Sequence, residues 1–114
     1  MGTRVKQGSE TTQYFCDIAA AFLEREGVTE GSLMGFPCLH VNGDFFSTCD
    51  YCNGDLIVKL PRTRVTNLIE AGHGDVFAPA GRTFKEWVLI KRRDKKTWVA
   101  LMNESREFVA QKKA

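Results

Sequence analysis

The side chains best suited to chemistry lie between positions 38 and 52 of this chain. They are Cys38, His40, Cys49 and Cys52. Three thiolates and one imidazole are an accepted ligand set for a structural zinc ion. The Cys49-x-x-Cys52 spacing also occurs in thiol redox proteins, where it stands at the N-terminus of a helix that lowers the thiol pKa.

Two Asn-Gly steps, Asn42-Gly43 and Asn53-Gly54, fix the elements that carry these residues. Both central residues of a type I′ hairpin turn need positive φ, which Asn and Gly tolerate. The two steps therefore predict a meander of three antiparallel strands. In this register Cys38 pairs with Ser47, and Cys49 pairs with Val58.

The predicted register argues against a metal site. Cys38 and Cys49 lie diagonally on one face, ~7–8 Å apart, which is too far for two zinc–sulfur bonds of ~2.3 Å to meet at one ion. Cys52 precedes a turn and not a helix, so a redox pair is also disfavoured. We predict no metal and no cofactor, and keep zinc on Cys38, His40, Cys49 and Cys52 as the alternative, together with a thiol function of Cys49 and Cys52.

Alternation along the strands sorts the meander into two faces. The face without formal charge is assigned to the core: Phe36, Cys38, His40, Phe45, Ser47, Cys49, Tyr51, Leu56, Val58 and Leu60. The other face mixes charge with an apolar group of Leu39, Val41, Phe46 and Ile57. An exposed apolar patch commonly marks a partner surface, so we predict self-association or protein docking there. The alternative is that the C-terminal helix covers this face.

No local motif marks a catalytic residue. The chain lacks a Gly-x-Ser-x-Gly elbow, a phosphate-binding loop and a dinucleotide fingerprint. We interpret His40 as a packed, hydrogen-bonded histidine. The sequence favours, without establishing, a protein that is not an enzyme, because catalytic residues need not lie in local motifs.

A basic segment is the candidate for nucleic-acid contacts. It places five cations in six residues, namely Lys91, Arg92, Arg93, Lys95 and Lys96. Cations of this kind bind phosphate backbones. The formal net charge is only +2 and no set of stacking aromatics adjoins the segment in sequence, so a solvated turn is favoured over nucleic-acid binding.

The remaining signals describe one small domain. The chain has 114 residues, 43% hydrophobic and 26% charged, enough for one core. Residues 1–8 are expected to be a flexible lead, and residues 9–112 a single domain. Helical spacing and end signals predict a first helix that ends at Gly27, a second after Pro61 and a third capped by Asp94. The order is helix, three strands, helix, one or two strands, helix, which predicts a two-layer α+β fold with an antiparallel sheet.

No apolar run spans a bilayer and no secretory leader is recognised, so we expect a cytoplasmic protein without membrane contacts.

The chain resembles the small domain at the N-terminus of TfoX/Sxy competence regulators. The resemblance covers roughly residues 12–110 and is carried by Phe36–Gly43, Leu56–Pro61, Arg64-Val65, Gly72–Phe77, Gly81-Arg82, Lys85–Val88, Trp98, Leu101, Glu104 and Phe108-Val109. It implies a two-layer fold like those of YjbR-like proteins and type III secretion chaperones, and no catalytic residues. Cys49–Cys52 departs from the family pattern. Together, the resemblance and the residue patterns predict a binding or regulatory module whose partner is a second copy of the chain or another protein.

Overall fold

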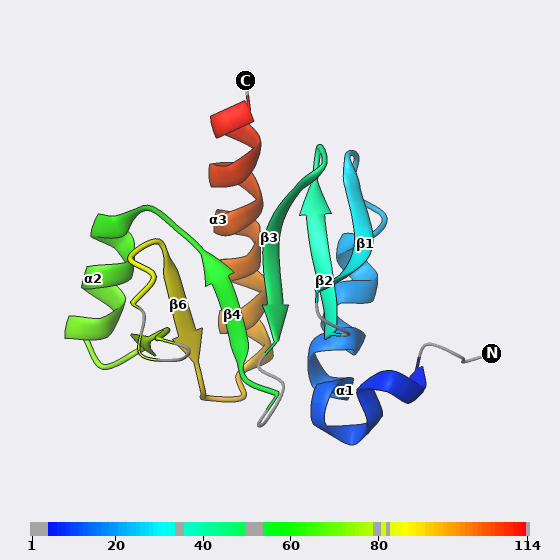
Figure 1. The fold of residues 1–114 in the computed structure, drawn as a ribbon, viewed down its shortest axis with the longest axis horizontal. Coiled ribbons are helices and arrows are strands. Elements are labelled where there is room, and N and C mark those ends of the chain that lie inside the picture. The colour runs from blue at the N-terminus through cyan, green and yellow to red at the C-terminus, as the bar shows by residue number, and fades with distance from the viewer. Residues whose placement is uncertain (1–4, 34–35, 50–53, 79–80, 82, 114) are drawn as a thin grey trace.

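The computed structural model describes residues 5–33, 36–49, 54–78, 81 and 83–113, and the side chains of residues 13–31, 37–49, 54–78, 81 and 83–111. The described chain forms three helices and one antiparallel sheet (Figure 1). The helices are α1 (Val5–Phe22), α2 (Arg62–Glu70) and α3 (Lys95–Lys113). The strands are β1 (Val28–Leu33), β2 (Phe36–Val41), β3 (Asp44–Cys49), β4 (Leu56–Lys59), β5 (Asp75–Val76) and β6 (Trp87–Ile90).

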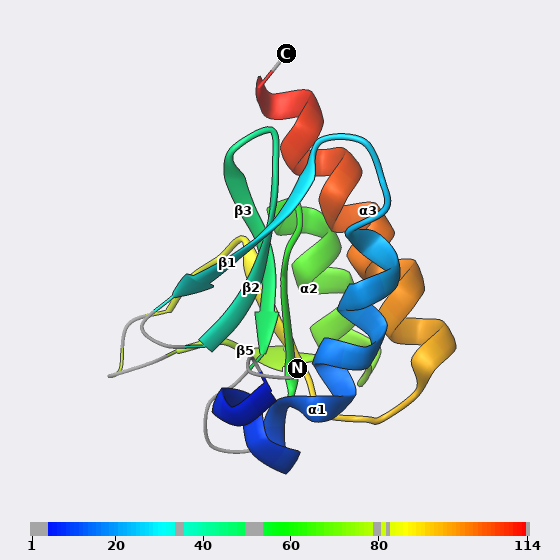
Figure 2. The ribbon, with the colours of Figure 1, turned by 90° about the vertical axis from the view of Figure 1, so that its right-hand side faces the viewer.

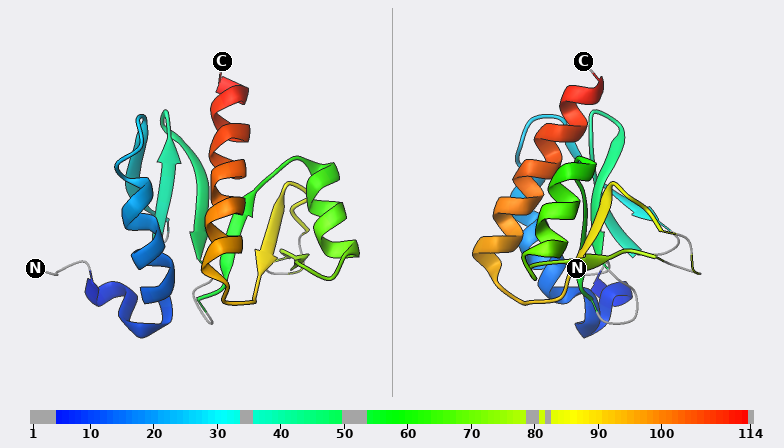
Figure 3. Two further views of the ribbon diagram at one scale, coloured as in Figure 1. Left: turned by 180° about the vertical axis from the view of Figure 1, so that it is seen from behind. Right: turned by 90° about the vertical axis from the view of Figure 1, so that its left-hand side faces the viewer.

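The sheet has the strand order β1-β2-β3-β4-β6-β5. Figure 2 shows the three described helices on one side of it, and the left panel of Figure 3 shows α1 over the β1 side, α3 in the middle and α2 over the β6 side. The predicted two-layer α+β architecture is confirmed. We call the sheet face away from the described helices the outer face.

Local signals located α2 and α3 better than α1. Gly72 follows the end of α2 with φ +82°, the conformation that glycine adopts most easily at helix ends. The first helix was predicted to end at Gly27 but ends at Phe22, and Gly27, with φ +80°, lies in the turn that leads to β1. Asp94 precedes α3 and its carboxylate accepts a hydrogen bond from the Thr97 hydroxyl at 2.7 Å. The first helix begins at Val5, inside the segment predicted as a flexible lead.

Strand β1 is the element that the sequence did not predict, so four strands precede α2 instead of three. Its sequence, Val-Thr-Glu-Gly-Ser-Leu, contains Glu, Gly and Ser, which are weak strand formers. The strand exists because all six of its residues pair in register with β2, from Val28 with Val41 to Leu33 with Phe36.

The Asn42-Gly43 turn has the predicted geometry, with φ +53° and +88°, and it pairs Val41 with Asp44 and His40 with Phe45. Beyond His40 the register shifts, because a bulge at Phe46 places Leu39 opposite Ser47 and Cys38 opposite Thr48. The predicted pair of Cys38 with Ser47 is therefore wrong.

The second predicted pair, Cys49 with Val58, is also wrong, because Cys49 pairs with Leu56. The two errors have different consequences. A displacement of two residues keeps every side chain on its face, whereas a bulge of one residue moves side chains to the opposite face. Among the described strand residues, the positions from Ser47 onward keep their predicted faces. Cys38, Leu39, His40, Val41, Phe45 and Phe46 are inverted.

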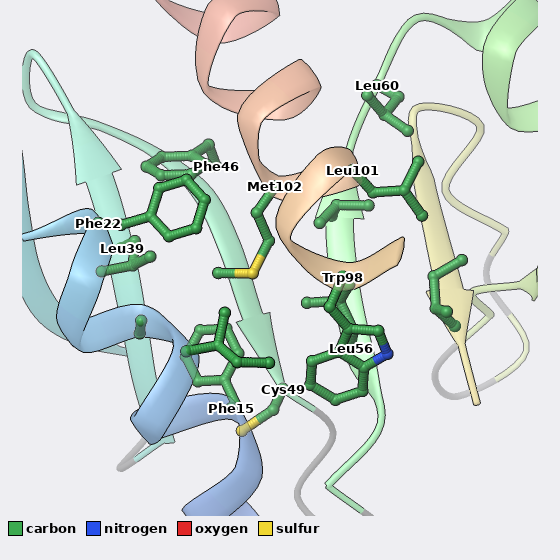
Figure 4. Close-up of a cluster of buried hydrophobic side chains, with 14 of the residues drawn as sticks. Phe15, Phe22, Leu39, Phe46, Cys49, Leu56, Leu60, Trp98, Leu101 and Met102 are labelled. Atoms are coloured by element: carbon green, nitrogen blue, oxygen red, sulfur yellow. The ribbon is translucent and has the colours of Figure 1, made fainter. Parts of the chain in front are cut away.

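The core lies between the sheet and the helices. Phe46 is fully buried and meets the Phe22 ring of α1 at 6.4 Å, and Figure 4 shows it facing Phe22 with Met102 of α3 nearby. The helices contribute Phe15, Ile18, Phe22, Val65, Leu68, Trp98, Leu101, Met102 and Val109, and the sheet contributes Val28, Leu39, Val41, Phe46, Cys49, Leu56, Val58, Val88 and Ile90.

Ser105 of α3 bridges the sheet at the bulge. Its hydroxyl donates a hydrogen bond to the Phe46 carbonyl at 2.8 Å. The same hydroxyl accepts a hydrogen bond from the Lys59 N–H, with 3.3 Å between the nitrogen and the oxygen. Phe46 is the extra residue of the bulge, and the pairs of β3 with β4 run from Cys49 with Leu56 to Ser47 with Val58, one residue short of Phe46 and Lys59. Buried backbone groups need a hydrogen-bond partner. The fully buried Ser105 thus supplies a hydrogen-bond partner for the bulged residue inside the core. Its position on the apolar stripe of α3 did not predict this role.

Candidate interaction site on the outer face of the sheet

The apolar group predicted as an interface does not form an exposed patch. Leu39, Val41 and Phe46 belong to the core under the helices, with 1%, 2% and 0% of their surface exposed. Ile57 lies on the outer face but is 4% exposed. The prediction is wrong because the bulge turns Leu39, Val41 and Phe46 toward the helices. The alternative, that the C-terminal helix covers this second face, is not adopted either, because the described helices lie on the other side of the sheet.

The outer face carries a row of ring side chains from β2, β3, β6 and the segment that joins β5 to β6. We call it the aromatic row: His40, Phe45, Trp87, Phe77 and Phe84. Its ring centroids follow one another at 5.9 Å from His40 to Phe45, 5.1 Å from Phe45 to Trp87, 6.3 Å from Trp87 to Phe77, and 5.6 Å from Phe77 to Phe84. Offset rings at such distances attract one another beyond the burial of their surface.

Local features account for the places of four of the five rings. His40 and Phe45 are a cross-strand pair beside the Asn42-Gly43 turn. The neighbouring residue on β1, Gly31, leaves room for the imidazole, because a Cβ there would lie 2.5 Å from its Cε1 atom. The Phe84 N–H donates to the Phe77 carbonyl at 3.1 Å, which brings the two rings together.

The outer face is accessible only in part. Cys38, Thr48 and Ile57 are buried there, and Thr48 donates its hydroxyl to the Pro37 carbonyl at 2.7 Å. The first four rings of the aromatic row are half-buried, and Phe84 is 37% exposed. A partner on this face would therefore contact the aromatic row.

Two cations on the outer face, Lys59 and Lys91, are each near a carboxylate. The Lys59 Nζ atom lies 5.8 Å from the Trp87 ring centroid and 3.9 Å from a Glu86 oxygen. At the other end, Lys91 Nζ lies 3.9 Å from an Asp75 oxygen. Each cation has a carboxylate beside it, so these residues do not form the positive surface that a nucleic acid needs.

The metal candidates are not brought together. Cys38 and His40 lie on the outer face, whereas Cys49 lies in the core on the helix side, so the sheet separates them; Cys52 lies outside the described residues. Burial, aided by the Glu30 carboxylate, raises the pKa of Cys38 to about 11, which opposes the thiolate that a metal or a nucleophile requires. Among the described residues, no group of three or more His, Cys, Asp or Glu side chains is placed to hold a metal ion.

The basic segment is divided between structural and exposed side chains. Arg93 donates to the Asp55 carboxylate at 2.8 Å and lies over the Tyr14 and Trp98 rings, at 5.9 Å and 5.4 Å from their centroids. Lys91 has Asp75 beside it, which leaves Arg92, Lys95 and Lys96 as exposed cations without an ion pair among the described contacts. The five residues therefore have different surroundings, and nucleic-acid binding by this segment stays an untested alternative.

Asp94, inside the same segment, has a structural role. Hydrogen bonds from the Thr97 hydroxyl and from the backbone N–H groups of Lys96 and Thr97, together with the nearby Arg92 cation, lower the pKa of its carboxyl. A carboxylate that accepts such bonds at a helix N-terminus is a capping group.

The sequence analysis did not identify Phe77, Phe84 and Trp87 as members of a candidate site. One signal was present: in β6, Trp87 and Leu89 alternate with Val88 and Ile90, and only the second pair is buried on the helix side. Because all four residues are apolar, the sequence pattern alone did not separate a partly covered outer face from the core.

The sequence matches no protein-family model, and no curated protein and no solved structure is significantly similar to it. The resemblance to TfoX/Sxy N-terminal domains therefore stays a prediction. Within the described ranges, no helix has the length and apolar character that crossing a membrane requires.

Proposed function

We propose that this chain is a small protein-binding module that receives an apolar segment of a protein partner on the aromatic row. The observation that carries the proposal is the continuous contact of five rings across the outer face, at centroid distances of 5.1–6.3 Å. Rigid aromatic side chains dominate the binding energy of many protein interfaces, because they bring large contact area at little entropy cost.

Charge favours a protein over a nucleic acid as the partner. Bases stack on aromatic rings, but single-strand binders add a positively charged groove. Here Lys59 and Lys91 each lie near a carboxylate. An apolar peptide segment flanked by charges of both signs fits this surface better than a polyanion does.

The titratable groups with shifted pKa values support binding over catalysis. The shift of Cys38 stabilises the protonated thiol, and the shift of Asp94 belongs to a helix cap. A regulatory role in the cytoplasm, as the resemblance to TfoX/Sxy N-terminal domains implies, is part of the proposal.

The proposal is tested by selecting peptides from a random library on the immobilised wild-type protein. Selected peptides should be rich in apolar residues, and their affinity should fall by about thirtyfold for Trp87→Ala, because a central aromatic residue contributes about 2 kcal/mol or more. Val76→Ser is the matched control, since Val76 is an exposed apolar residue on β5 outside the aromatic row. Its affinity for the same peptides should equal that of the wild type.

Two results would overturn the proposal. One is that the selected peptides bind Trp87→Ala as tightly as the wild type. The other is that oligothymidylate quenches Trp87 emission with a steep salt dependence while no peptide is enriched, which would assign the row to nucleic-acid stacking.

A further inference from the structure

His40 differs from the other four members of the aromatic row, because it is the member that can take up a proton. Histidine is the side chain whose ordinary titration falls between pH 5 and 8. The chain has two histidines, and the second, His73, follows α2 and takes no part in the ring contacts of the row. The charge of the row in this pH range therefore depends on His40.

The His40 imidazole lies against the strands on both sides of β2. On β1, a Cβ at Gly31 would lie 2.5 Å from the imidazole Cε1 and 2.8 Å from its Nδ1, so the ring is close to the Gly31 backbone. On β3, the Phe45 ring centroid lies 5.9 Å from that of the imidazole. His40 is half-buried, and a segment bound along the row would cover much of the surface that it still exposes.

Within the described residues, no carboxylate compensates a positive charge on this imidazole. The His40 side chain has no hydrogen bond and no ion pair among the described contacts. The charged residues next to it on the flanking strands, Glu30 and Asp44, lie opposite Leu39 and Val41. Because those two residues belong to the core, both carboxylates start from the helix side of the sheet.

The described neighbours of His40 on the outer face are neutral. Thr29 lies opposite it on β1, and Phe45 lies opposite it on β3. Cys38, two residues earlier on β2, stays protonated, since burial and the Glu30 carboxylate raise the pKa of its thiol to about 11. The contact with Phe45 attracts a cation weakly, but it is already present in the free protein and adds nothing when a ligand binds.

We infer that the aromatic row binds its apolar partner segment with His40 neutral, so that acidification weakens the binding. A cation that is covered by an apolar segment loses its water, and nothing in these surroundings replaces it. Lys59 beside Trp87 differs, because the Glu86 carboxylate lies 3.9 Å from its ammonium group. The inference rests on the proposed function and adds a regulation of the same site.

The test measures the affinity of the selected peptides by isothermal titration calorimetry at about pH 7.5 and about pH 5.5. The peptides have blocked termini and contain no Asp, Glu or His, so that their own charge stays constant. For the wild type, the dissociation constant should be about tenfold higher at the acid pH, as expected for a ligand that binds only the neutral form of a histidine.

Two variants remove the titration at His40. His40→Phe keeps a ring in the row, and His40→Gln keeps the test decisive if a phenyl ring does not fit against Gly31. Each should bind with the same dissociation constant at both pH values. His73→Gln is the matched control, since it replaces the other histidine of the chain and should keep the pH dependence of the wild type. Emission of the fully buried Trp98 verifies that each protein is folded at both pH values.

Equal wild-type affinity at the two pH values would overturn the inference and leave the proposed function intact. Tighter binding at the acid pH would also overturn it, by indicating a ligand that favours the imidazolium. A pH dependence that survives in the His40 variants, or that is lost in His73→Gln, would assign the effect to another group. If no peptide binds even at the higher pH, the proposed function itself fails, so the two failures are distinguishable.

Discussion

Phe45 and Phe46 are neighbours in the chain and lie on opposite faces of the sheet. Phe46 is fully buried against Phe22 under the helices, while Phe45 is half-buried on the outer face between His40 and Trp87. The helix-covered face is a buried interior, in which Ser105 of α3 bonds the Phe46 carbonyl and the Lys59 N–H. The outer face joins its rings to charged residues at its margins. The comparison shows that the same residue type can be part of the core on one face of the sheet and part of the proposed binding surface on the other.

The largest expected effect separates these two phenylalanines. Phe46→Ala should lower the free energy of unfolding by about 3–5 kcal/mol, because it removes a buried ring and leaves a cavity. Phe45→Ala should cost about 1–2 kcal/mol, since the ring is only half-buried. Urea unfolding curves of both variants measure the difference. An equal loss for the two variants would contradict the assignment of faces.

The next largest difference in stability is expected between substitutions of Ser105 on the helix-covered face and of Thr48 on the outer face. Ser105→Ala should lower the free energy of unfolding by about 2–3 kcal/mol, because the buried Phe46 carbonyl and Lys59 N–H both lose their partner. Thr48→Val is the matched control on the outer face, where one hydroxyl donates to the Pro37 carbonyl, and it should cost about 1 kcal/mol. A smaller loss for Ser105→Ala than for Thr48→Val would mean that the bridge does not hold the bulge.

Two ion pairs, one more buried than the other, are expected to differ less in their contributions to stability. Arg93 lies 2.8 Å from the Asp55 carboxylate, whose side chain is 7% exposed, whereas the outer-face pair of Lys59 with Glu86 is 3.9 Å long and more exposed. Arg93→Ala should cost about 1–2 kcal/mol, because it leaves the Asp55 carboxylate without its cation. Lys59→Ala should cost less than about 1 kcal/mol. Chemical denaturation of both variants decides whether the loss follows burial in this way.

The last effect concerns the thiol of Cys38 and is absent at neutral pH. Its pKa is raised to about 11 from the ordinary 9.0, so the folded protein keeps the proton where the unfolded chain loses it. The stability that this thiol contributes should be present below pH 9 and decline as the pH rises from 9 toward 11. Cys38→Ser should abolish that part of the decline in thermal unfolding.

Iodoacetamide labelling followed by peptide mapping gives the matching chemical readout. At pH 8, Cys38 should react slowly in the folded protein and rapidly in urea. Rapid labelling of Cys38 in the folded protein would indicate an accessible thiolate and would reopen a thiol function on the outer face.

Much of the fold was predictable from local signals. The Asn42-Gly43 turn, the glycine after α2, and the Asp94 cap depend on the conformations of single residues, so the sequence states them directly. Strand β1 was not predictable in this way, because its pairing with β2 supplies the order that its own residues do not favour.

The candidate site was less predictable than the fold. The pairing of His40 with Phe45 was predicted, but both residues were assigned to the core face and lie on the outer face. The metal candidates failed for the same reason, since the bulge at Phe46 places Cys38 and Cys49 on opposite sides of the sheet. The aromatic row joins residues far apart in the sequence, such as Phe45 and Trp87.

The sequence by itself determined the class of fold, the end of α2, the cap of α3, the first hairpin turn and the apolar stripe of α3, because each follows from local conformation or from a regular period. The tertiary structure alone decided the bulge, and with it which face of β2 is interior. The reason is that a bulge depends on compensation from elsewhere in the fold, here from Ser105, and no local pattern around Phe46 records that the helix will supply it.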